Sequence, residues 1–175
     1  MVKVTLLLFC LLSLAACAAS AGHSWTGADT RAAAKLLADE VLRAGWHDVP
    51  ASGDGELPAL LVGELTAVEK LELPLTQLRL ELCQALLESR QLRLVVPRGL
   101  WPEGTDAGFR SGDRNAALAS GADAWLQGSV DSISGRGTPL YRFRFELWDT
   151  RREIRLAASE ILYPPSSGNT PEPAS

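Results

Sequence analysis

The residues best suited to recognising a partner are five arginines gathered in the last hairpin that the sequence predicts. A guanidinium group pairs with a carboxylate through two hydrogen bonds and stacks on aromatic rings, so arginine is common at protein interfaces. The chain as a whole is acidic, with a formal net charge of -4. A basic surface in this setting could meet an acidic protein patch, an anionic polymer or a lipid headgroup. The alternative is a solvent-facing sheet surface on which Glu146 and Glu153 lie among the arginines. The five are Arg142, Arg144, Arg151, Arg152 and Arg155.

Two aromatic residues form a second candidate binding feature. Trp101 and Phe109 lie in a glycine-rich stretch between residues 98 and 112, which predicts a loop. Exposed aromatic side chains act as anchors in many interfaces. Folding of this loop back over the core is an equally good interpretation.

Catalytic chemistry finds little support in the residue types present. Cys83 lies within an apolar helical pattern, which favours a small core residue over a nucleophile. A catalytic thiol would need a histidine close by, and His23 and His47 both fall outside the predicted helices and strands. No Gly-x-Ser-x-Gly elbow and no phosphate-binding glycine motif occurs. We therefore predict a protein that is not an enzyme and that uses no metal or cofactor. The acidic charge balance also argues against binding to nucleic acid.

The beginning of the chain has the layout of a signal for export. Lys3 precedes an apolar run that is too short to span a bilayer, and small residues follow it. The sequence Leu14-Ala15-Ala16-Cys17 resembles the lipobox of bacterial lipoproteins. This resemblance implies that residues 1–16 are removed as a signal peptide and that Cys17 carries the lipid that attaches the protein to a membrane. In lipoproteins of Gram-negative bacteria, alanine at position 18 favours the outer membrane, with the domain on its periplasmic face.

Hydrophobic periodicity predicts the elements that must position these groups. Helices are expected at 28–44, 75–90 and 113–120, and strands at 58–65 and 91–96. In the helix at 75–90 the apolar stripe is wide, because Leu80, Cys83 and Leu87 broaden it, and such a stripe suggests a helix laid against a sheet. Three further strands, at 123–133, 140–148 and 153–163, are joined by short turns and predict an antiparallel meander. The fold class is therefore α/β, a mixed sheet with a C-terminal three-strand meander and helices packed on it.

The domain limits follow from composition. Residues 17–27 read as the lipidated cysteine and a short tether, residues 28–163 as one α/β domain, and residues 164–175 as a disordered, proline-rich tail.

The order of these segments resembles that of the LpoB family of penicillin-binding protein activator lipoproteins. The stretches that carry the resemblance follow the lipobox and read TGADTRAAAKLLADEVL, PALLVGEL, LLESRQLRLV, NAALASGADAWLQGSVDSI and PLYRFRFELWDTRREI. The resemblance implies a fold like the N-terminal domain of TolB and part of CsgG. It also implies a non-catalytic protein whose partner is a class A penicillin-binding protein, which it stimulates in peptidoglycan synthesis. The identity of that partner and the oligomeric state are not set by the sequence.

The tether differs from that of the LpoB family, whose members carry a long proline-rich linker before the domain. Here residues 18–27 reach at most ~35 Å when extended. Such a reach suits work close to the anchoring membrane. An outer-membrane assembly or secretion accessory of the CsgG and TolB type is therefore the alternative function.

Overall fold

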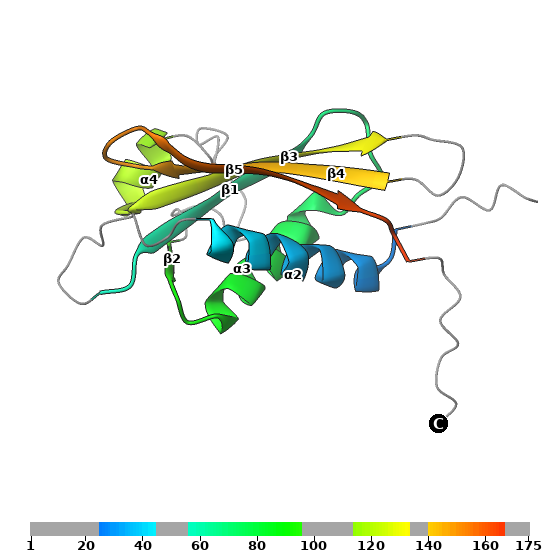
Figure 1. The fold of residues 1–175 in the computed structure, drawn as a ribbon, viewed down its shortest axis with the longest axis horizontal. Coiled ribbons are helices and arrows are strands. Elements are labelled where there is room, and N and C mark those ends of the chain that lie inside the picture. The colour runs from blue at the N-terminus through cyan, green and yellow to red at the C-terminus, as the bar shows by residue number, and fades with distance from the viewer. Residues whose placement is uncertain (1–24, 45–55, 96–113, 134–139, 167–175) are drawn as a thin grey trace, which may run out of the picture. The chain divides into compact units, whose positions relative to one another are not determined.

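The computed structural model describes residues 25–44, 56–95, 114–133 and 140–166, which form one compact unit. The predicted order of elements is confirmed. Three helices and five strands follow one another as α-β-α-β-α-β-β-β (Figure 1). Their bounds are α2 Gly27–Arg43, β1 Ala59–Ala67, α3 Leu75–Glu88, β2 Arg93–Val95, α4 Arg114–Ser120, β3 Ala124–Ile133, β4 Leu140–Asp149 and β5 Arg155–Tyr163.

The five strands form one mixed sheet in the order β2-β1-β3-β4-β5. β1 pairs in parallel with both β2 and β3, whereas β3, β4 and β5 pair antiparallel as the predicted meander. The first four residues of β1, Ala59 to Val62, are all buried, as expected for a parallel strand covered on both faces. The predicted mixed sheet with a C-terminal meander is therefore confirmed.

Helix α2 begins at a capping box. Thr26 is its N-cap, and the Thr26 hydroxyl accepts a hydrogen bond from the backbone N–H of Asp29. The Asp29 carboxylate in turn accepts from the backbone N–H of Thr26 at 2.9 Å. Two N–H groups that a helix end leaves unpaired are thereby satisfied.

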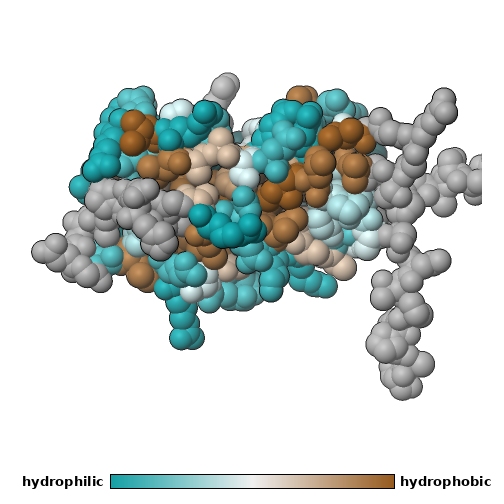
Figure 2. Space-filling model, in the orientation of Figure 1, coloured by the Kyte–Doolittle hydropathy of each residue, from teal (hydrophilic) through white to brown (hydrophobic). Residues whose placement is uncertain are grey.

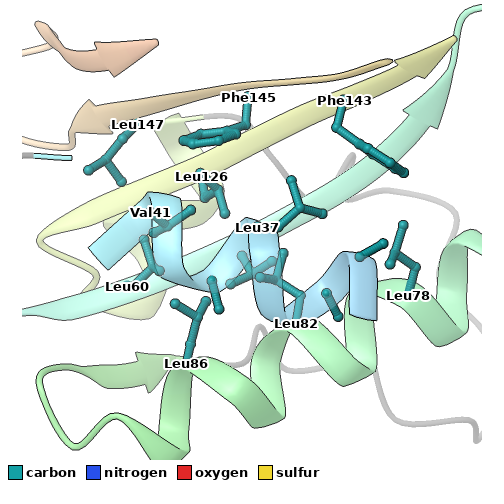
Figure 3. Close-up of a cluster of buried hydrophobic side chains, with 14 of the residues drawn as sticks. Leu37, Val41, Leu60, Leu78, Leu82, Leu86, Leu126, Phe143, Phe145 and Leu147 are labelled. Carbon is teal, nitrogen blue, oxygen red and sulfur yellow. The ribbon is translucent and has the colours of Figure 1, made fainter. Parts of the chain in front are cut away.

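The main core lies between one face of the sheet and the pair of helices α2 and α3 (Figure 3). Leu78, Leu82 and Leu86 are the buried residues of α3. The wide apolar stripe predicted for this helix is not buried as a whole, because Leu80 and Leu87 remain more than half exposed. A helix against a sheet buries only the side that faces its neighbours, and these two leucines project from the other side.

A second, smaller core lies on the opposite face of the sheet. Side chains alternate along a strand, so Leu61 and Trp125 point away from α2 and α3 and pack with Ala116 and Ala117 of α4. Helix α4 ends at Ser120 and is followed by Gly121, whose φ of +73° is the left-handed conformation that follows the last residue of many helices. Because α4 has only seven residues, it covers this face at one end, and none of the described helices lies over much of the face formed by β3, β4 and β5 (Figure 1).

The compact unit runs from Trp25 to Ser166. Trp25 packs edge-on against Tyr141, with ring centroids 4.9 Å apart, and its indole N–H donates to Thr30. At the other end, Ser166 donates two hydrogen bonds to Asp29.

Among the described residues no helix is both long and apolar enough to cross a bilayer. Brown apolar patches reach the surface on the face that Figure 2 shows. Leu36 of α2 and Leu162 of β5 are among the exposed large apolar residues.

Candidate protein-binding surface

Three of the five predicted arginines lie on the sheet face opposite α2 and α3, over the part of β3, β4 and β5 that α4 does not cover, here called the helix-free face. Phe143, Phe145 and Leu147 point into the main core, so the alternating residues of β4 point to the opposite face. Arg142 and Arg144 lie there, and Arg155 joins them from β5, where Trp148 pairs with it in register. Arg142 and Arg144 therefore lie opposite the apolar face of their strand.

Arg142 is held by a carboxylate that the sequence did not single out. Its Nε and Nη2 donate to the two oxygens of Asp131 at 2.8 and 2.5 Å, and the two residues are directly opposite each other on β3 and β4. The hydrogen bond from Arg142 lowers the pKa of Asp131, although burial of the carboxyl opposes this. The same contact raises the pKa of Arg142. Arg144 extends the group, because its guanidinium lies 3.1 Å from Glu160 and 3.5 Å from Asp131.

Glu146 is the centre of a second polar group on this face. It accepts hydrogen bonds from Arg155, Gln127 and the Trp148 indole, at 2.8, 2.8 and 3.2 Å. The hydrogen bond from Arg155 is the main cause of a lowered pKa for Glu146. Trp148 also stacks on Trp125, with the two ring planes only 9° apart. The charges of the helix-free face are thus largely paired with one another, as the alternative interpretation of the sequence expected for Glu146.

Arg151 and Arg152 lie elsewhere, in the turn between β4 and β5. Their side chains are 59% and 60% exposed, and their guanidinium groups lie 3.9 Å from the carboxylates of Asp123 and Asp149. Glu153 follows them in the turn and pairs with Arg114 of α4 at 3.2 Å. The five arginines therefore divide into three on the sheet face and two in the turn.

Sequence analysis missed the residues that shape this turn. Asp149 is 1% exposed, and its Oδ1 accepts from the backbone N–H groups of Arg151 and Arg152. An aspartate at the end of a strand, directly before a polar run, is the pattern that could have revealed it, because aspartate often closes a turn onto its own following backbone. Arg114 and Asp131 gave no comparable local signal, since their partners are distant in sequence.

Several predicted site residues lie outside the described residues. These are Cys17, Trp101 and Phe109, together with the two histidines. Cys83 is described and lies half-buried against the main core, where burial raises the pKa of its thiol. A raised pKa keeps a thiol protonated and unreactive.

The described residues offer no obvious place for a metal. No group of three or more histidine, cysteine, aspartate or glutamate side chains there could hold an ion. A hollow of about 600 Å³ lies between the end of β1 and the beginning of α3, where Glu64 and Arg79 are its charged lining residues. One carboxylate beside one guanidinium is not a set of metal ligands.

The arrangement of the sheet and helices matches solved structures. The C-terminal domain of LpoB from Salmonella enterica superimposes with a TM-score of 0.52 at 20% sequence identity, covering 74% of this chain and 94% of that domain. This chain has the fold of the LpoB C-terminal domain. The LpoB domain from Escherichia coli gives 0.51 at 16% identity, covering 77% of this chain and 98% of that domain. The resemblance to LpoB predicted from the sequence is thereby confirmed at the level of the fold.

A looser match is the lipoprotein GNA1162 from Neisseria meningitidis, with a TM-score of 0.46 at 17% identity, covering 64% of this chain and 84% of that one. Comparison with protein-family models and with curated protein sequences finds no match.

Proposed function

We propose that this chain is a lipid-anchored, periplasm-facing binding protein that stimulates a class A penicillin-binding protein in peptidoglycan synthesis. The observation that carries the proposal is the LpoB-like fold, which spans nearly the whole LpoB domain and follows a lipobox-like segment ending at Cys17. In this proposal the protein is not an enzyme and requires no cofactor, and its arginines, with Trp101 and Phe109, contact the partner.

The polar face of the sheet supports a role in binding over one in catalysis. Its charged side chains form ion pairs with one another, and Cys83 is held protonated against the core. A nucleophilic thiol needs to be deprotonated, whereas Cys83 packs against the main core, where burial raises the pKa of its thiol.

The experiment is a pull-down of the class A penicillin-binding proteins of the source cell with the lipidated chain, followed by an assay of glycan polymerisation. We expect binding to one of them and an increased polymerisation rate. A chain that is shown to be folded, but binds none of them, would contradict the proposal.

Attachment to the membrane is tested separately by Cys17→Ser. The variant is expected to leave the membrane fraction after signal cleavage, whereas Cys83→Ser, which also removes one thiol, should remain there. Retention of the signal-cleaved Cys17→Ser protein in the membrane fraction would show that the lipoprotein assignment is wrong. Separation of inner and outer membranes then tests the proposed outer-membrane location.

The short segment between Cys17 and Trp25 favours a second candidate, an outer-membrane assembly or secretion accessory of the CsgG and TolB type. A protein held close to its own membrane suits an assembly in that membrane. Deletion would then disturb an envelope appendage or a secretion route and leave peptidoglycan synthesis unchanged. Reduced peptidoglycan synthesis with normal secretion would favour the first proposal.

A further inference from the structure

The turn between β4 and β5 is held in one conformation by its own backbone and by Asp149. The Asp149 carboxylate accepts from the N–H groups of Arg151 and Arg152 at 2.8 and 2.7 Å. The Asp149 backbone N–H donates to the carbonyl of Ile154, and its carbonyl accepts from Glu153. We call residues 150–154 the arginine turn.

A second set of contacts braces the arginine turn from outside. Arg114, the first residue of α4, donates to the carbonyl of Thr150 at 3.1 Å and pairs with Glu153 at 3.2 Å. The N–H of Thr150 donates to the carbonyl of Asp123. Glu153 has a φ of +58°, an uncommon conformation for a residue with a side chain. Such conformations persist where the surrounding structure fixes them, and they gather at functional sites.

The arginine turn projects the kinds of side chain that anchor protein interfaces. Arg151 and Arg152 are 59% and 60% exposed, and Ile154 is 47% exposed. Arg142, on the sheet face, is only 29% exposed and is bound by both oxygens of Asp131. The guanidinium groups of Arg151 and Arg152 lie farther from their carboxylate neighbours, at 3.9 Å from Asp123 and Asp149, and stay exposed. Because the turn is already rigid, contact with a partner would cost little conformational entropy.

The turn also lies at the end of the unit far from its first residue. Trp25 packs on Tyr141 and Tyr163, at the beginning of β4 and the end of β5. The turn lies at the other end of both strands, about 26 Å from Tyr141 at 3.3 Å per residue. Figure 1 shows the beginning of α2 and the end of β5 together at one end of the sheet, with α4 and the loop between β4 and β5 at the other. When Cys17 carries a lipid, Trp25 is the residue of the unit that is nearest to the anchor along the chain.

We propose that the arginine turn is the surface that docks onto the penicillin-binding protein, against an acidic patch of that protein with an apolar centre. The inference rests on the function proposed above and names the part of the chain that performs it. The forked guanidinium groups of Arg151 and Arg152 pair with carboxylates of the partner, while Ile154 fills the apolar centre.

The test measures the affinity of the full lipidated chain in detergent for the purified penicillin-binding protein. Arg151→Glu with Arg152→Glu reverses both charges of the turn. The matched control is Arg31→Glu with Lys35→Glu, which makes the same change of net charge on the exposed side of α2. Arg151→Ala with Arg152→Ala serves as the milder variant, and circular dichroism confirms that each variant is folded.

We expect the reversed turn to weaken binding by about a hundredfold, the alanine pair by about tenfold, and the α2 control by less than about twofold. Ile154→Ser should weaken binding without altering its salt dependence.

Unchanged binding by the reversed turn would overturn this inference while leaving the proposed function intact, and so would an equal loss in the α2 control. Failure of the wild-type chain to bind any class A penicillin-binding protein would instead overturn the proposed function, and the docking assignment with it. A further arm uses vesicles containing anionic phospholipid and the Cys17→Ser chain. If the turn arginines govern retention on these vesicles and not binding to the protein, the turn recognises lipid and the inference is wrong.

Discussion

The hydroxyl of Tyr163 donates a hydrogen bond of 3.2 Å to the carboxylate of Asp29, and so joins the end of the last strand to the first turn of α2. The same carboxylate accepts from Thr26 and from Ser166. Burial by itself would raise the pKa of Asp29, but these hydrogen bonds outweigh burial and hold the pKa far below its ordinary value. Burial, with the nearby Asp29 charge, raises the pKa of Tyr163. One buried carboxylate thus fastens both ends of the folded unit.

This arrangement predicts a loss of stability in acid. Because the pKa of Asp29 is lower in the folded chain than in the unfolded chain, its contribution is fully present above the unfolded value of about 3.9. The contribution falls as the pH decreases below that value. Asp29→Asn should lower the free energy of unfolding at pH 7 by about 2–3 kcal/mol, as expected for lost hydrogen bonds to a charged group.

Urea denaturation at pH 7 and at pH 3 measures this effect. The difference between wild type and Asp29→Asn should shrink at the lower pH. Asp39→Asn, an exposed aspartate of the same helix, is the control and should change stability little. If the two proteins differ in free energy of unfolding by the same amount at both pH values, the charge of the Asp29 carboxylate is not what stabilises the contact between the two ends of the unit.

The pair formed by Asp131 and Arg142 predicts that removing one partner is worse than removing both. Asp131 is only 9% exposed, so Arg142→Met would leave a nearly buried carboxylate without its main partner. The double variant Asp131→Asn with Arg142→Met should have a higher melting temperature than Arg142→Met alone. Thermal unfolding measures both melting temperatures. A higher melting temperature for Arg142→Met than for the double variant would contradict the prediction and would indicate that Arg144 alone pairs with Asp131.

Gly128 allows β3 to approach the side chain of Leu65. A Cβ atom at position 128 would lie 2.8 Å from Leu65 Cδ2, which is closer than such atoms normally come. Because Leu65 Cδ2 is the end of a flexible side chain that can move aside, Gly128→Ala should destabilise the unit by less than about 1 kcal/mol.

The two sites should also be coupled. The double variant Gly128→Ala with Leu65→Ala should lose less than the sum of the two single variants, as measured by urea denaturation. Simple additivity would mean that the clash with Leu65 is not the cause.

The stacked indoles of Trp125 and Trp148 should be visible by spectroscopy. Their ring centroids are 5.6 Å apart and nearly parallel, a geometry in which two indoles couple electronically. We expect a coupled pair of bands in the far-ultraviolet circular dichroism that Trp148→Phe abolishes. Removal of Trp25, which stacks on no other tryptophan in the described residues, should leave these bands unchanged. Their persistence in Trp148→Phe would exclude the stacked pair as their source.

Local patterns in the sequence were sufficient for the order and type of the elements. The capping of α2 by Thr26 and Asp29, the end of α4 before Gly121 and the alternation along β4 each depend on residues within a few positions of one another. The division of α3 into a buried side and an exposed side could not be predicted, because it depends on where α2 and the sheet lie. Leu80 and Leu87 have the same chemistry as Leu82 and differ only in what faces them.

For the candidate binding surface too, the sequence determined some features and the tertiary structure others. The sequence determined that five arginines lie in the last hairpin, because that follows from their order along the chain. Only the tertiary structure decided which carboxylate each of them meets. Arg142 meets Asp131 and Arg155 meets Glu146 across strands, whereas Arg114 reaches the arginine turn from a helix 36 residues away along the chain. Charge pairing depends on the distance between two groups in space. That distance cannot be obtained from their separation along the sequence, because it is set by the register of the paired strands and by the packing of the helices.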